Sequence, residues 1–286
     1  MGGREARAGL LFVLPALLAL ALLLLYPLLD TVRLSVTDDA GRLVGLANFE
    51  AVLEARLTGI ALKNTILYVG GSLVLQVVLG TAAGILLNQP LRGRAALRSL
   101  MLIPWIVPGI VAATTWAWMF HYEFGILKWL WVASGLGTEP VGWLTTRATV
   151  LPSLIAVNVW KLFPFVAVMV LAGLQAIPQS LYEAARVDGA GFWAEVRHVM
   201  LPQLKGVLLA VTLLLFIWGM NAITIIYAMT RGGPANASLI TPIQIFQEAF
   251  ELFQFGTASA LSVLLFAGVA VVIAVYVRLM TRSAAA

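Results

Sequence analysis

Residues 149–175 have the sequence TVLPSLIAVNVWKLFPFVAVMVLAGLQ, in which Lys161 is the only charged side chain. A helix rises about 1.5 Å per residue, so about 20 apolar residues cross the hydrocarbon core of a bilayer. This stretch is long enough and apolar enough to do so. It therefore predicts a transmembrane helix.

Five further apolar runs of similar length lie at about residues 10–29, 60–87, 99–120, 206–229 and 256–280. Hydrophobic residues make up 61% of the chain and charged residues 11%, whereas a soluble domain has about a quarter charged residues. The expected fold class is all-α, a polytopic membrane protein with six transmembrane helices. The expected division is an N-terminal segment (1–9), a first span (10–29), an external segment (30–59), a core of five spans (60–280) and a tail (281–286).

The first run resembles a secretory signal, because Arg4 and Arg7 precede it. It is longer than the apolar part of such signals. The sequence Tyr26-Pro27-Leu28-Leu29-Asp30 at its end also lacks the small residues that signal peptidase requires. We therefore expect an uncleaved first span.

The charges in the connecting segments predict the orientation, since positive residues favour the cytoplasmic side. With the N-terminus in the cytoplasm, that side holds four carboxylates and ten basic residues: Arg4, Arg7, Arg92, Arg94, Arg98, Arg186, Arg197, Lys205, Arg278 and Arg282. The other side holds seven basic residues and nine carboxylates. Both termini are thus expected in the cytoplasm. The net charge of +5 forms no basic stripe, so no nucleic-acid partner is predicted.

Two features are expected on the external side. Residues 46–53 have apolar side chains at helical spacing after a possible Asn48 cap, which predicts a short interfacial helix. Trp129, Trp131 and Trp143 are interpreted as anchors in the membrane lipid interface, where an amphipathic ring is stable half in water and half in lipid.

The segment between the fourth and fifth spans, residues 176–203, has the most distinctive pattern. Pro178 suits a helix start, and residues 179–187 favour a helix that Gly189 and Gly191 would end. A second helix over 192–200 is expected to stop at Pro202. Two interpretations are open: a compact knob that fits a cleft on a soluble partner, or an amphipathic loop on the lipid headgroups.

This segment resembles the EAA loop of ABC importer permeases through Glu183-Ala184-Ala185, Asp188-Gly189-Ala190 and Leu201-Pro202. The resemblance extends over nearly the whole chain. Its other matching segments are Leu46-Ala47-Asn48-Phe49, Asn64-Thr65, Ile103-Pro104 and Gly232-Gly233-Pro234. It points to the carbohydrate importers, and there to the maltose-type first permease of a heterodimeric pair. The chain departs from that type by lacking extra N-terminal spans and a large external domain.

The resemblance implies a type I ABC importer fold in the membrane of a prokaryotic cell, with coupling helices seated in a groove of an ATPase dimer. The implied ATPase-coupling residues are Glu183, Ala184, Ala185, Asp188, Gly189, Ala190, Leu201 and Pro202. ATP and magnesium would bind to the partner ATPase, and no cofactor to this chain. The other implied partners are a second, related permease, an external solute-binding protein and a sugar. The resemblance implies an oligosaccharide or a disaccharide as that sugar.

Polar residues inside spans are costly and are therefore candidates for a substrate pathway. The resemblance implies such a pathway at Asn158, Lys161, Phe165, Gly219 and Asn221. Asn158 matches a sugar-contacting asparagine, whereas Gly219 replaces a hydrogen-bonding side chain. The alternative for each polar residue is packing between helices, and for Lys161 an ion pair with the second permease. The prolines at 104, 108, 152 and 164 are expected to bend their spans, and Gly70, Gly71, Gly80 and Gly84 to allow close helix contact.

The sequence disfavours two other classes of function. An ion-driven secondary carrier would need a membrane carboxylate, and no acidic residue lies in the middle of a span. A membrane-embedded enzyme would need a catalytic set, but His121 and His198 lie in separate segments. The chain has no cysteine and no GxxxxGK[ST] phosphate loop, so no catalytic or metal residue is predicted and the ATPase must be another chain.

Overall fold

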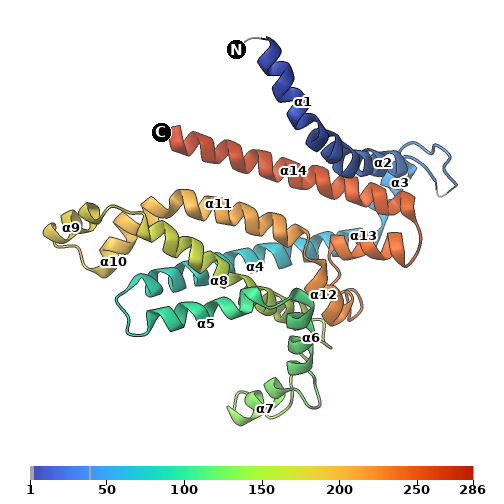
Figure 1. The fold of residues 1–286 in the computed structure, drawn as a ribbon. Coiled ribbons are helices and arrows are strands. Elements are labelled where there is room, and N and C mark those ends of the chain that lie inside the picture. The colour runs from blue at the N-terminus through green and yellow to red at the C-terminus, as the bar shows by residue number, and fades with distance from the viewer. Residues whose placement is uncertain (1–2, 39, 286) are drawn as a thin grey trace. The chain divides into compact units, whose positions relative to one another are not determined.

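The computed structural model describes residues 3–38 and 40–285, which form helices joined by turns and loops (Figure 1). Within these ranges the β pairing is limited to one isolated antiparallel bridge between Thr37 and Leu43. The prediction of an all-α protein is confirmed. The chain divides into two compact units: unit 1 comprises residues up to 59 and 244–271, and unit 2 comprises residues 60–243 and those from 272 onward.

The first apolar helix belongs to unit 1. It consists of α1 (Gly3–Leu20), the π-helical segment η1 (Ala21–Leu25) and α2 (Tyr26–Ser35). Residues Phe12–Ser35 are long and apolar enough to span a membrane, and the most apolar window in them contains no buried residue. An apolar surface on all sides suits a helix surrounded by lipid or by other membrane helices.

The rest of unit 1 is built from α3 (Ala47–Glu54) and parts of α13 (Thr241–Phe250) and α14 (Phe255–Ala285). Val52 of α3 packs with Ala260 and Leu261 of α14. The predicted short helix is confirmed, but its predicted cap is wrong because Leu46 occupies the N-cap position. The Asn48 amide instead donates to the carbonyl oxygens of Ser35 (3.0 Å) and Thr37 (2.8 Å) in the preceding turn.

Unit 2 is a helical bundle with short helices at both ends (Figure 1). Its long helices are α4 (Arg56–Asn88, from residue 60 onward), α5 (Arg94–Ile106), α8 (Val150–Gln175) and α11 (Leu201–Met220). At one end lie α6 (Gly109–Met119), α7 (Ile126–Ala133) and α12 (Ile223–Thr230), and at the other α9 (Gln179–Val187) and α10 (Phe192–Glu195). Buried aliphatic side chains, among them Val166, Val170, Leu204 and Val211, fill the bundle.

Helices α4 and α8 pack backbone to backbone at two glycines. A Cβ added at Gly80 would lie 2.4 Å from the Val166 Cβ, and one at Gly84 would lie 2.7 Å from the Val170 Cγ1. The predicted close contact is therefore confirmed at these positions. It is wrong at Gly70, where an added Cβ would have nothing within 4 Å.

Two of the predicted spans are broken. Helices α5 and α6 meet at an angle of 92°, because Val107 has an extended ψ of 129° and Pro108 has no N–H to continue the helix. With this bent pair taken as one span, the described residues contain six candidate spans. The predicted continuous helix over 206–229 is wrong, since α11 ends at Met220 and α12 begins at Ile223.

The expected stop at Pro202 is also wrong. Helix α10 continues through the π-helical segment η2 (Val196–Met200) directly into α11, so that residues 192–220 form one long helix. Pro202 occupies the second position of α11. The wider π turn just before it changes the hydrogen-bond register, so the missing N–H of Pro202 does not end the helix.

Candidate functional site

Three of the predicted pathway residues share one face of α8. Asn158, Lys161 and Phe165 are three and four residues apart, which places their side chains on the same side of a helix. Asn158 is buried, and its backbone carbonyl oxygen accepts a hydrogen bond from the Gln76 amide at 3.2 Å. Lys161 and Phe165 are half-buried. These three predicted pathway residues therefore lie along one side of α8, Asn158 buried and the other two partly exposed.

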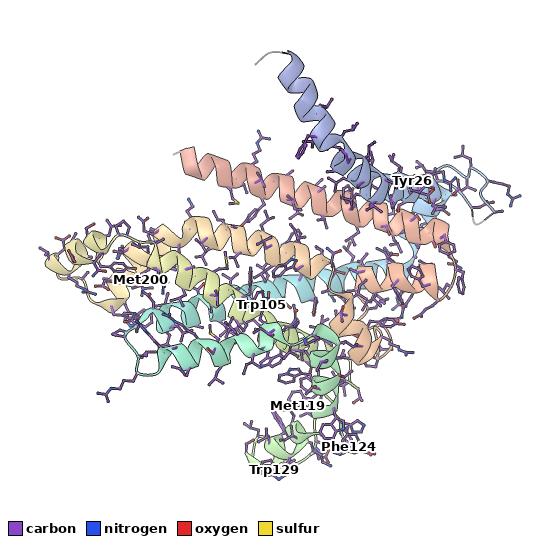
Figure 2. All side chains as sticks on the ribbon, in the orientation of Figure 1. Tyr26, Trp105, Met119, Phe124, Trp129 and Met200 are labelled. Atoms are coloured by element: carbon purple, nitrogen blue, oxygen red, sulfur yellow. The ribbon has the colours of Figure 1, made fainter. Side chains whose placement is uncertain are left out.

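Two tryptophans extend this surface. The ring of Phe165 lies 5.7 Å from that of Trp105, which is labelled in Figure 2 near the end of α5, and 5.0 Å from that of Trp218 on α11. Neither tryptophan was predicted from the sequence. Their positions next to Pro104 and Gly219 were the available signals. Asn158, Phe165, Trp105 and Trp218 are called the wall below.

The Lys161 side chain reaches the break between α5 and α6. Its Nζ donates a hydrogen bond to the carbonyl oxygen of Val107 and lies 3.5 Å from that of Trp105. The predicted alternative partner was a carboxylate of a second permease. In this chain the ammonium group instead has backbone acceptors at a helix end.

The remaining pathway residues face elsewhere. Gly219 is buried against α4, and a Cβ there would lie 3.1 Å from the Val69 Cγ1, so the missing side chain permits helix contact. Asn221 lies exposed at the break after α11, and its amide donates to the Ile217 carbonyl of the same helix at 2.9 Å. Thr224 lines a separate cavity of about 370 Å³ between α6 and α12.

The three tryptophans expected as lipid anchors lie in two kinds of surroundings near α7. The rings of Trp131 and Trp143 meet edge to face at 5.6 Å, and Trp143 also lies 5.9 Å from Phe120. Trp129 is 66% exposed and lies on α7, below α6 in Figure 2. Trp131 and Trp143 are half-buried against other aromatic rings, and the anchor interpretation stays a prediction for all three tryptophans.

Two segments of the family pattern meet at the end of unit 2 that carries α12. The Asn64 amide donates to the carbonyl oxygens of Asn236 (3.1 Å) and Leu239 (3.0 Å), and the Thr65 hydroxyl accepts from the Thr241 backbone N–H at 2.9 Å. Arg231, Ala235 and Asn236 in this loop have positive φ, which is unfavourable for residues other than glycine. Hydrogen bonds from α4 thus hold a strained loop in one shape.

The loop predicted for ATPase coupling lies at the opposite end of unit 2, beyond Met200 in Figure 2. Helix α9 ends in a Schellman motif, in which Gly189 has a φ of +79°. The Ala190 N–H donates to the Ala185 carbonyl and the Gly189 N–H to the Arg186 carbonyl. Six of the eight predicted coupling residues are exposed, and Ala185 and Ala190 are half-buried. The exposed residues are Glu183, Ala184, Asp188, Gly189, Leu201 and Pro202.

An ion pair joins the two helices of this loop. The Arg186 Nε lies 2.9 Å from the Glu195 Oε1, and the Glu195 side chain is largely buried. Burial and, second, the Glu195 carboxylate raise the pKa of the neighbouring Tyr182. Glu195 and Tyr182 were not predicted, because no local pattern marks a carboxylate that is paired across a turn.

Comparisons with known proteins agree with this architecture. Residues 76–284 match the family described as "binding-protein-dependent transport system inner membrane component". The trehalose/maltose transport system permease protein MalF of Thermococcus litoralis is 37% identical over 268 residues, covering 92% of this chain and 90% of that protein. The diacetylchitobiose uptake system permease protein DasB of Streptomyces coelicolor is 31% identical over 285 residues, covering 92% and 86%.

The fold is also similar to solved structures. One is a bacterial ABC transporter involved in the import of the acidic polysaccharide alginate, with a TM-score of 0.83 at 18% identity over 98% of this chain and 96% of that chain. Another is a bacterial alginate ABC transporter in complex with an alginate pentasaccharide-bound periplasmic protein, with a TM-score of 0.84 at 19% identity over 95% and 93%. The predicted type I ABC importer fold is therefore confirmed.

Proposed function

The chain belongs to the family of binding-protein-dependent transport system inner membrane components, and we propose that it forms half of the translocation pathway of an ATP-driven sugar importer. One observation carries the proposal: the residues that match the family, 76–284, contain both the wall and the coupling loop. The named functions of the relatives support a disaccharide or oligosaccharide as the substrate.

The chemistry of the wall is compatible with a sugar. The aromatic rings of Trp105, Phe165 and Trp218, which pack together at tilted angles, can cover the apolar face of a pyranose ring. The Asn158 amide can both donate to and accept from hydroxyl groups. We assign the pathway to Asn158 and Phe165 directly. Lys161, Gly219 and Asn221 support the pathway indirectly. Lys161 acts through the end of α5, Gly219 through its contact with α4, and Asn221 through the end of α11.

We further propose that α9 and its turn dock into a groove of an ATPase dimer, which binds ATP and magnesium and performs the hydrolysis. The Schellman turn and the Arg186–Glu195 ion pair support this role, because they make the loop stiff enough to transmit motion. The other partners are a second, related permease and an external solute-binding protein. The complex lies in the cytoplasmic membrane of a prokaryote, with both termini of this chain in the cytoplasm.

The proposal is tested by purifying the tagged chain from its native membrane in mild detergent and identifying its partners by mass spectrometry. An ATPase, a second permease and a solute-binding protein are expected, and the reconstituted complex should import maltose or trehalose only with ATP. Recovery of the chain alone, with uptake driven by an ion gradient, would contradict the proposal and favour a carrier.

Two substitutions test the coupling loop separately. Glu183→Ala and Gly189→Val should weaken ATPase association, because Glu183 is exposed and Gly189 needs a left-handed φ that valine disfavours. Gly191→Val is a matched control in the same loop, since an added Cβ there has nothing within 4 Å and its φ of −79° suits any residue. Full ATPase association of both test variants would disprove this docking surface.

A further inference from the structure

Lys161 contacts backbone groups that the break in the helix leaves without their usual partners. Helix α5 ends at Ile106, and Pro108 has no N–H with which to continue the hydrogen-bond ladder. The Lys161 Nζ donates to the Val107 carbonyl and lies close to the Trp105 carbonyl. The single ammonium group of Lys161 therefore lies next to two carbonyl oxygens at this helix end.

The membrane makes this contact important. Unpaired carbonyl groups are costly in hydrocarbon, and a lysine inside a span is costly as well. The C-terminal end of a helix also carries a partial negative charge, which favours a nearby cation. The contact thus lowers the cost of both the Lys161 ammonium group and the unpaired carbonyl oxygens, and it needs no carboxylate.

The end of α5 that Lys161 contacts also positions one aromatic ring of the wall, that of Trp105. Trp105 lies in the last turn of α5, and its ring packs against Phe165, which in turn contacts Trp218. Phe165 lies one helical turn from Lys161 on the same face of α8. A shift of the end of α5 would therefore move the Trp105 ring away from Phe165.

We propose that Lys161 is a positioning residue: its ammonium group holds the broken end of α5 on α8 and thereby keeps the Trp105 ring in the wall. Lys161 acts through the backbone and does not contact the sugar. The inference rests on the proposed function, because the wall contacts a sugar only if the chain is a sugar permease.

A structural measurement tests the positioning without any substrate. The chain has no cysteine, so Leu100→Cys on α5 and Thr115→Cys on α6, both exposed, introduce two unique spin-label sites. The double-cysteine chain is spin-labelled before it is combined with its partner subunits, and the distance is measured by pulsed electron paramagnetic resonance in the assembled transporter in lipid nanodiscs. Lys161→Met, which lacks a donor, should shift or broaden the distance distribution. Lys161→Arg and Lys161→Gln, which keep donors, should preserve it.

A transport measurement tests the route through Trp105. Lys161→Met is compared in the native and Trp105→Ala backgrounds by uptake of radiolabelled maltose into proteoliposomes. In the native background it should raise KM by about threefold to tenfold, the value of one aromatic contact. In the Trp105→Ala background the further effect should be below about twofold, because the ring that Lys161 positions is absent.

The outcomes separate the inference from the proposed function. An unchanged distance distribution in Lys161→Met would overturn the positioning role, whatever the transport result. Equal effects on KM in both backgrounds would overturn the route through Trp105 and indicate direct contact with the sugar. Absence of maltose uptake by the unmodified complex, together with the expected change in distance, would count against maltose as a substrate and leave the positioning role supported.

Discussion

Gly80→Ala provides a direct test of the packing between α4 and α8. The new Cβ would lie 2.4 Å from the Val166 Cβ and 2.8 Å from the Phe163 carbonyl oxygen. Carbon atoms in favourable contact are about 3.5–4.0 Å apart, so the helices must separate by about 1 Å. Because one neighbour is backbone, a change of rotamer cannot relieve the clash.

The expected net effect is destabilising. Inserting a methyl group into a packed contact costs about 1–3 kcal/mol, whereas replacing a helical glycine by alanine gains about 0.5–1 kcal/mol. The difference is a net loss of roughly 0–2.5 kcal/mol, with about 1 kcal/mol near its centre. Gly70→Ala on the same helix is the matched control, since an added Cβ there meets nothing within 4 Å and only the gain should remain.

The assay is thermal unfolding of the purified chain in one detergent, followed by the loss of the monodisperse peak in size-exclusion chromatography. Gly80→Ala should lower the midpoint temperature and Gly70→Ala should leave it unchanged or raise it slightly. An equal or higher midpoint for Gly80→Ala than for Gly70→Ala would refute the close contact between the two helices.

Three further predictions concern the two ends of unit 2. Glu195→Gln should weaken the contact with Arg186 and lower the protection of α9 in hydrogen exchange by about 1 kcal/mol, a value limited by the exposure of Arg186; unchanged exchange would contradict it. Because the pKa of Tyr182 is raised, its stabilising contribution is complete below about pH 10 and is lost as the pH rises through the raised pKa. Tyr182→Phe should remove this alkaline loss in a proteolysis assay. Asn64→Ala leaves two carbonyl oxygens unpaired and should destabilise the loop that Asn64 holds by about 1–3 kcal/mol. Asn64→Asp cannot donate a hydrogen bond when ionised, so it should not restore the stability of the loop. Equal protease resistance of Asn64→Ala and the unmodified chain would exclude this role.

Local patterns were sufficient for several features of the candidate site. The three-residue and four-residue spacing of Asn158, Lys161 and Phe165 placed them on one face of a helix, as the structure shows. The end of α9 near Gly189 also followed from the sequence, because glycine adopts a left-handed φ easily. These predictions depend on bonds within one helix or turn, so neighbouring residues contain the necessary information.

Other features depended on segments that are distant in the chain. Trp105 and Trp218 join Phe165 from two different helices, and Glu195 pairs with Arg186 across a turn. The edge-to-face contact between Trp131 and Trp143 likewise joins two separate segments. A side chain's partner is decided by packing between elements, which hydrophobic periodicity does not encode.

By itself, the sequence determined that this is an all-α membrane protein, because long apolar runs must satisfy their backbone hydrogen bonds within helices in lipid. Its motifs also determined the family. Only the tertiary structure decided that α5 and α6 meet at 92° and that Lys161 is directed at the carbonyl groups of that break. Proline predicts where a helix is weakened, but the angle of the break and the donor that supports it depend on neighbouring helices.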